Sequence, residues 1–266
     1  MLLAIDVGNT NTVFAVFDDA VPGNGEAPLG EWRCNTESVR TADQYYVWLS
    51  QLMEHSGLSA AEIGKVVVSN VAPAVLFNIR VLCDRYFNTR PLVVGRPECQ
   101  LPVDVRVDNP AEVGADRLVN TVAAFERYGG NLVIVDFGTA TTFDVVAHDG
   151  AYEGGVIAPG VNLSLDALHH AAAHLPRVDV TKPQRVTGTN TVACLQSGIY
   201  WGYVGLIEGV CARIEAERES ALHVIATGGL SSLFARGTER IRTVDPDLTV
   251  RGLVQIHRYN TEISTV

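Results

Sequence analysis

One short pattern occurs twice in the chain, and this repeat limits the folds that the sequence can adopt. A run of β-forming residues ends in Asp-x-Gly-[Asn/Thr], a second β-forming run follows, and a turn comes next. The first copy begins at Leu2 and contains Asp6, and the second begins at Leu132 and contains Asp136, 130 residues later. One copy could arise by chance, but two copies in the same local context predict two similar halves that face each other.

Helical spacing fills much of the sequence between the strands. It predicts helices over residues 41–55, with Thr41 as the N-cap, and over 76–87, 110–128 and 191–218. Gly129 and Gly130 end the third of these helices and mark the boundary between the halves. We therefore expect an α/β fold with halves at residues 1–129 and 130–266. Each half is expected to be a mixed sheet flanked by helices, with the active site in the cleft between them.

Charge and cysteine content disfavour several classes of protein. The 266 residues include 20 Lys and Arg against 30 Asp and Glu, a net charge of −10, which disfavours nucleic-acid binding. Five cysteines without a C-x-x-C pair argue against a disulfide framework or a zinc ribbon and fit a reducing cytoplasm. The first apolar run ends at Asp6, and no apolar stretch approaches the ~20 residues of a membrane span. We expect a cytoplasmic protein without membrane contact.

The first copy of the repeat has the chemistry of a phosphate-binding hairpin. A strand delivers the carboxylate of Asp6, and Gly8 permits a tight turn and the close approach of a ligand. Residues 9–12 add short polar side chains and main-chain N–H groups, while the carboxylate is placed to hold Mg²⁺, often through water. A hairpin turn rich in Asn and Gly, with no ligand, explains this copy alone equally well.

The second copy strengthens the nucleotide hypothesis. Two phosphate hairpins facing each other could clamp the β- and γ-phosphates of a nucleotide, and phosphoryl transfer needs mainly positioning and charge neutralisation. Thr227-Gly228-Gly229 follows another strand and could let an adenosine lie against bare backbone, although two glycines there are equally often a simple turn. Neither G-x-x-x-x-G-K-[ST] nor a G-x-G-x-x-G after a strand occurs, so Walker-type ATPases and Rossmann dehydrogenases lack support.

A second polar cluster, Gly114-Ala115-Asp116-Arg117, lies at the start of the predicted third helix. An aspartate next to an arginine at a helix N-terminus suits anion binding and a carboxylate base. For an isolated Asp-Arg pair, however, helix capping with a surface ion pair is the commoner explanation.

The chain as a whole resembles a type III pantothenate kinase, a bacterial family within the actin-like and hexokinase-like ATPases. The matching strings occur in the family's order along nearly the full length. They are DVGNTNT at 6–12, PAEVGADR at 110–117, DFGTATT at 136–142, GGVIAPG at 154–160, GTNT at 188–191, QSG at 196–198 and ATGGL at 226–230. The resemblance implies two ribonuclease-H-like halves and ATP-dependent phosphorylation of pantothenate, the first step of coenzyme A synthesis.

The resemblance also implies roles for individual residues. The ATP phosphates are expected at Asp6, Val7, Gly8, Asn9, Thr10, Asn11, Thr12, Val13 and Thr139, with Asp6 near Mg²⁺. Pantothenate is expected at Gly114, Ala115, Asp116, Arg117 and Thr191, with Asp116 as the general base. Asp136 matches a ligand of a monovalent cation, K⁺ or NH₄⁺. The family is dimeric, and the partner subunit helps to close the pantothenate pocket.

Several positions depart from the family's pattern, and two other functions stay open. Gln100 stands where a glycine is common, Val107 where many members have a tyrosine, and Cys194-Leu195 where Ala-Met is usual. A regulatory nucleotide-binding factor of the same fold is one alternative, which the intact Asp6, Asp116 and Asp136 weakly oppose. A kinase of the same fold that acts on another small alcohol is the second.

Overall fold

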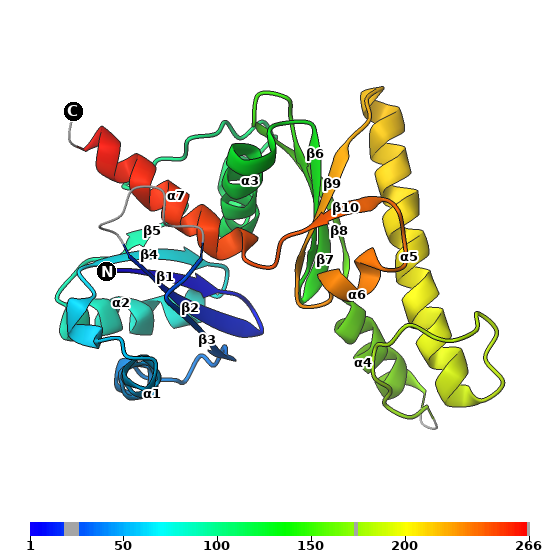
Figure 1. The fold of residues 1–266 in the computed structure, drawn as a ribbon, viewed down its shortest axis with the longest axis horizontal. Helices are drawn as coiled ribbons and strands as arrows, with labels where there is room; N and C mark the ends of the chain where they lie inside the picture. The colour runs from blue at the N-terminus through cyan, green and yellow to red at the C-terminus, as the bar shows by residue number, and fades with distance from the viewer. Residues whose placement is uncertain (19–26, 173–174, 265–266) are drawn as a thin grey trace. The chain divides into compact units, whose positions relative to one another are not determined.

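The chain divides into two compact units, each built on a five-stranded mixed sheet (Figure 1). The computed structural model describes residues 1–18, 27–172 and 175–264. Unit 1 comprises residues 1–104, 108–126 and 247–266, and unit 2 comprises residues 105–107 and 127–246. No helix in the described ranges is both long and apolar enough to cross a membrane.

The sheet of unit 1 has the strand order β3-β2-β1-β4-β5. Its strands are β1 (Leu2–Val7), β2 (Asn11–Phe17), β3 (Gly30–Asn35), β4 (Lys65–Asn70) and β5 (Leu92–Val93). The first three form an antiparallel meander, whereas β4 pairs in parallel with β1, and β5 pairs in parallel with β4. This arrangement puts the carboxyl end of β1 next to the carboxyl end of β4.

Helices cover both faces of this sheet, which explains why its central strands are apolar throughout. Helices α1 (Ala42–His55) and α2 (Pro73–Phe87) pack on the face that carries Leu3 and Ile5. Helices α3 (Ala115–Tyr128) and α7 (Leu248–Ile263) pack on the face that carries Leu2 and Ala4. Short 3-10 turns occur at η1 (Ala60–Glu62) and η2 (Pro110–Glu112). The predicted N-cap of α1 is confirmed, because Thr41 forms a capping box with Gln44.

The sheet of unit 2 has the order β10-β9-β6-β7-β8. Its strands are β6 (Leu132–Phe137), β7 (Ala140–Val146), β8 (Tyr152–Pro159), β9 (His223–Gly228) and β10 (Ile241–Val244). Its helices are α4 (Val161–Ala171), α5 (Thr191–Arg218) and α6 (Ser231–Ala235). Residues of α5 and α6 pack on the face that carries Val133 and Val135.

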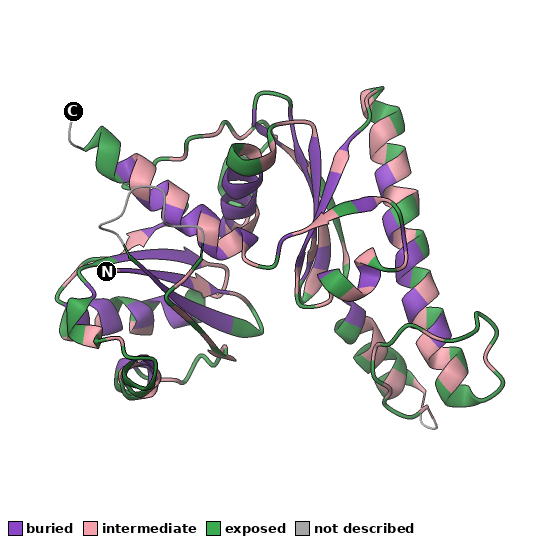
Figure 2. Cartoon of the chain, in the orientation of Figure 1, coloured by how far each residue is buried: buried purple, intermediate pink, exposed green. Residues whose placement is uncertain are grey.

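The two sheets repeat the same local plan, so the prediction of two similar mixed-sheet halves is confirmed. β1 and β6 each begin an antiparallel meander and pair in parallel with a later strand. The central strands of both sheets are largely buried (Figure 2). β1 and β6 have the same burial pattern, in which the aspartate is the only residue that is not buried. Asp6 lies opposite Ser69 on β4, and Asp136 lies opposite Thr227 on β9.

Several predicted boundaries differ from those of the structure. The helix expected over 76–87 begins three residues earlier, at Pro73. The helix expected over 110–128 begins at Ala115, because η2 is a separate turn and Val113 after it is extended. Residues 247–266, expected in the second half, belong to unit 1, because α7 packs against β1 and β4. Residues 105–107 belong to unit 2, where Val105 forms a bridge with Tyr152.

Candidate active site

The turn between β1 and β2 presents an exposed, polar tip. The N–H of Gly8 donates to the carbonyl of Asn11 at 3.0 Å, which closes the turn. A β-carbon at Gly8 would lie 3.0 Å from that same carbonyl oxygen, so the tight closure favours glycine there. Asn9, Thr10 and Asn11 are exposed, whereas Thr12 and Val13 are buried beneath them. Of the predicted phosphate residues 6–13, Asn9, Thr10 and Asn11 are therefore the most open to a ligand, and Asp6 and Gly8 are half-buried.

Asp6 lies at the carboxyl end of β1 in an unusual electrostatic state. Its Oδ1 atom is buried and accepts no hydrogen bond from the described residues. Burial raises the pKa of Asp6 from its ordinary 3.8 to about 7, and the charge of Asp116 adds to this shift. The neighbouring Ser69 and Arg33 oppose the shift. The structure thus brings Asp6 and Asp116 within electrostatic reach of each other inside unit 1.

The first turn of α3 holds Asp116 in a fixed orientation. Its Oδ1 atom accepts a hydrogen bond from the N–H of Arg117 at 2.8 Å. A β-carbon on Gly114 would lie only 2.5 Å from that oxygen, so glycine leaves room for the carboxylate. Burial raises the pKa of Asp116, while the N–H and the charge of Arg117 oppose the rise. The half-buried carboxylate is therefore both oriented and more basic than an exposed one.

The second hairpin, between β6 and β7, has a similar construction in unit 2. Gly138 and Thr139 are exposed at its tip, and the carbonyl of Thr139 accepts the N–H of Gly160 at 3.1 Å. Behind the tip, Gly228 has a φ of +86° and comes so close to Asp136 that a β-carbon would lie 2.7 Å from Oδ1. The backbone of Gly228, within the predicted Thr227-Gly228-Gly229 turn, therefore lies directly against the Asp136 carboxylate.

Thr191 lies on a different element of unit 2. It is exposed at the first position of α5, where the side chain of Asn190 caps the helix by accepting the N–H of Ala193 at 2.9 Å.

Three residues of unit 1 that lie around the first hairpin were not predicted from the sequence: Thr36, Ser69 and Arg33. The alternating polar and apolar residues of GEWRCN at 30–35 are typical of a half-buried strand. That strand contains Arg33 and ends just before Thr36, so this pattern would have indicated both residues.

Residues present in the structure fit the cations that the resemblance implies. The buried Oδ1 of Asp6, without a hydrogen-bond partner among the described residues, suits a proton or a hard cation such as Mg²⁺. The carboxylate of Asp136 and the carbonyl of Phe137, both facing Gly228, are oxygen donors of the kind that K⁺ uses. Within the described ranges, no group of three or more His, Cys, Asp or Glu side chains could hold a metal by itself.

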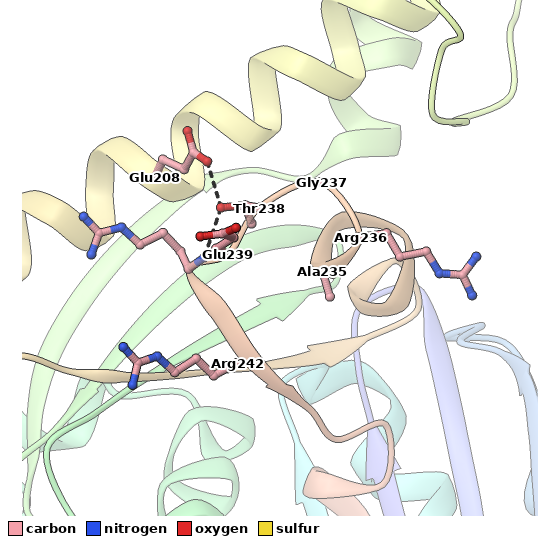
Figure 3. A pocket seen from close by; sticks show the side chains of 8 residues that line it. Glu208, Ala235, Arg236, Gly237, Thr238, Glu239 and Arg242 are labelled. Carbon is pink, nitrogen blue, oxygen red and sulfur yellow. Dashed lines mark hydrogen bonds between the residues drawn. The ribbon is translucent and has the colours of Figure 1, made fainter.

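A hollow of about 700 Å³ in unit 2 is lined by none of these residues (Figure 3). It is lined by Glu208, Ala235, Arg236, Gly237, Thr238, Glu239, Arg240 and Arg242. The Thr238 hydroxyl donates to Glu208 at 2.8 Å, and the side chains of Arg236 and Arg242 point to opposite sides. The third arginine, Arg240, is paired with Glu215. The three arginines therefore do not converge on one point, and the hollow does not have the form of an anion site.

Solved structures with the same fold have diverse descriptions. A Campylobacter jejuni protein described as a Baf family transcriptional activator matches with a TM-score of 0.60 and 19% identity, covering 98% of this chain and 99% of that chain. Component A of (R)-2-hydroxyglutaryl-CoA dehydratase from Acidaminococcus fermentans matches with a TM-score of 0.53 and 13% identity, covering 99% and 98%. At such low identity these likenesses establish the two-lobed α/β fold alone.

Sequence comparison identifies the family. A model of the family described as type III pantothenate kinase matches residues 2–213. The type III pantothenate kinase of Ruegeria sp. (strain TM1040) is 62% identical over 263 residues, which cover 99% of this chain and 98% of that protein. That of Dinoroseobacter shibae is 62% identical over 262 residues, covering 98% and 100%. The chain therefore belongs to the type III pantothenate kinase family.

Proposed function

We propose that this protein transfers the γ-phosphoryl group of ATP to the primary hydroxyl of pantothenate, forming 4′-phosphopantothenate in the first step of coenzyme A synthesis. Membership of the family supports the reaction. The observation that carries the assignment is the carboxylate of Asp116, which the Arg117 N–H orients in the first turn of α3. Its raised pKa gives it the basicity that a proton acceptor needs.

The transfer requires one proton acceptor and one phosphoryl acceptor. The pantothenate hydroxyl oxygen forms a bond to the γ-phosphorus as the bond from that phosphorus to the β–γ bridging oxygen breaks, and ADP leaves. Asp116 orients the hydroxyl and accepts its proton as the transfer proceeds, because an alcohol is too weak an acid to ionise beforehand. Arg117 is placed beside it to pair with the pantothenate carboxylate or a phosphate.

We assign the ATP phosphates to the 6–13 hairpin and to Thr139, whose exposed tips offer main-chain N–H groups. Asp6 would hold Mg²⁺, in part through water, and Asp136 a monovalent cation, K⁺ or NH₄⁺. Bound cations neutralise phosphate charge and so favour attack by the hydroxyl. Gly114, Ala115 and Thr191 are assigned to pantothenate.

We also infer a homodimer that forms through unit 2. Its exposed large apolar side chains lie on β8, on α4, in the loop before α5 and at the start of α5, whereas a monomer rarely exposes large apolar patches. They are Val156, Ile157, Leu163, Leu168, Val186 and Val192. Thr191 lies next to Val192, so a partner that covers these side chains would also border the assigned pantothenate residue.

The five free cysteines support a reducing, cytoplasmic location.

Measuring ADP release by the purified protein with MgATP tests the proposal. We expect turnover only when pantothenate is present, and a lower rate when Na⁺ replaces K⁺. Equal rates in both buffers would keep the kinase and remove the cation role of Asp136. Absence of turnover with pantothenate, in K⁺ or NH₄⁺, would overturn the kinase assignment, and turnover with another small alcohol would then identify the acceptor.

A further inference from the structure

Thr36, the residue that follows β3, is bonded to the first phosphate hairpin at several points. Its hydroxyl donates to the carbonyl of Gly8 at 2.8 Å and lies 2.9 Å from the hydroxyl of Thr12. Its main-chain N–H donates to the carbonyl of Thr10 at 2.9 Å. One half-buried side chain thus reaches both ends of the turn that carries Asn9 and Asn11.

The direction of these bonds follows from the number of hydrogens. A threonine hydroxyl has one hydrogen, and Thr36 gives it to the Gly8 carbonyl. The contact between the two hydroxyls must then have Thr12 as donor and Thr36 as acceptor. Thr12 is fully buried, so its hydroxyl supports the turn from below instead of contacting a phosphate. This refines the role expected for Thr12.

The bonds to Thr36 also orient the peptide groups at the tip. In a trans peptide the C=O and the N–H point in opposite directions. Because the carbonyl of Gly8 points to Thr36, the N–H of Asn9 points away from it. The same geometry at the Thr10 carbonyl directs the N–H of Asn11 away from Thr36. Two main-chain donors, on the exposed residues Asn9 and Asn11, are therefore directed away from Thr36 and are not used by it. Free N–H groups on a turn are what an anion-binding loop uses.

We propose that Thr36 is a positioning residue for ATP, because its hydroxyl holds the β1–β2 turn in the conformation whose N–H groups bind a phosphate. The proposal rests on the assignment of this turn to the ATP phosphates. Without the hydroxyl, the Gly8 carbonyl loses its donor and the Gly8–Asn9 peptide is free to rotate. ATP must then order the turn on binding, which lowers its affinity.

Variants of Thr36 separate the hydroxyl from the rest of the side chain. Thr36→Val keeps the shape and removes the hydroxyl, and Thr36→Ser keeps the hydroxyl. We expect Thr36→Val to raise the KM and the calorimetric Kd for ATP about tenfold, with kcat and the KM for pantothenate changed less than about twofold. Thr36→Ser should restore ATP affinity to within about threefold of the original protein.

Thr249→Val provides the matched control. Thr249 is also half-buried in unit 1, and its hydroxyl donates to Asn120 at 2.8 Å, away from the hairpin. This variant should lose a similar amount of thermal stability without a change in ATP affinity. Thr36→Ala, which cannot crowd its neighbours, replaces the valine variant if that protein does not fold.

The outcomes distinguish this proposal from the proposed function. Unchanged ATP affinity in Thr36→Val, or no recovery in Thr36→Ser, would overturn the positioning role. An equal loss of ATP affinity in Thr249→Val would overturn it too, since the effect would then be general destabilisation. Because ATP binding is measured without pantothenate, failure of the original protein to phosphorylate pantothenate would refute the kinase assignment and leave the test of Thr36 intact.

Discussion

Gly114 and Asp116 are in such close contact that a single β-carbon on the glycine would lie 2.5 Å from the Oδ1 atom of the aspartate. Gly114 has no positive φ, so its backbone conformation does not require glycine. The space that it leaves is occupied by the carboxylate that we assign as the general base. Glycine is therefore needed at position 114 because any side chain there would meet the Asp116 carboxylate.

Gly114→Ala should disable catalysis while the fold survives. The atom that the new methyl group meets is the end of a flexible side chain, so the Asp116 carboxylate turns away at little cost to stability. Losing the orientation of a general base lowers kcat by roughly 10²-fold, because a small misplacement of reacting groups costs about that much. Steady-state kinetics with a thermal melt measures both quantities. Normal kcat in a folded variant would show that the orientation of Asp116 does not matter.

Asp116→Asn should abolish turnover and leave ATP binding at least as tight. The amide cannot accept the hydroxyl proton, so kcat should fall by about 10²–10⁴-fold. The substitution also removes a negative charge that acts on Asp6, so ATP affinity should stay the same or rise. Calorimetry with ATP and an ADP-release assay measure the two effects. Turnover near the original rate would mean that Asp116 is not the base.

Gly252→Ala should destabilise unit 1. Gly252 lies in α7 where this helix meets α3, and a β-carbon there would lie 2.2 Å from the carbonyl oxygen of Val119. Backbone cannot move as a side chain can, so we expect a loss of about 2 kcal/mol or more, seen as a lower Tm.

Gly205→Ala is the matched control for this substitution. Gly205 lies within α5 with no atom within 4 Å of an added β-carbon. Alanine should therefore stabilise the helix by up to about 1 kcal/mol. If both variants changed Tm in the same direction, close packing of α7 on α3 would not be the cause.

His223 should make stability depend on pH. Burial and the charge of Arg242 lower the pKa of His223 in the folded protein. The unfolded chain, with an ordinary pKa of about 6.5, then binds the proton more readily. The stabilisation that His223 provides above pH 6.5 is therefore lost as the pH falls from 6.5 through the lower pKa that His223 has in the folded protein.

Comparison with His223→Gln isolates this contribution, because glutamine does not titrate. The Tm of the original protein relative to the variant should fall between pH 7.5 and pH 5.5. A constant difference across this range would contradict the expected pKa shift. His223 also contacts the hydroxyl of Thr243 at 2.8 Å. The variant loses that contact at every pH, so this loss changes the Tm difference by a constant amount and does not alter its dependence on pH.

Local sequence was sufficient for the repeated hairpins and for the longest helix. The helix predicted over 191–218 has those bounds in the structure, since it begins directly after the cap at Asn190 and no proline interrupts it before Arg218. The hairpins were predictable because an Asp-x-Gly turn between two β-forming runs is encoded within about a dozen neighbouring residues. The edge strands β3, β8 and β10 were not predicted. β3 alternates between half-buried and exposed residues, and β8 and β10 each have one buried residue, so none has the continuous apolar run that marks β1 and β6.

The sequence by itself determined which chemical groups the protein has: two aspartates after strands, glycine turns beside them, and Asp116 next to Arg117 at the start of a helix. Tertiary structure decided what those groups can do. It returned residues 247–266 to unit 1, placed Asp116 within electrostatic reach of Asp6, and bonded Thr36 to the hairpin tip. These outcomes depend on contacts between residues far apart in the chain. Burial and neighbouring charge arise from such contacts and have no local signature in the sequence.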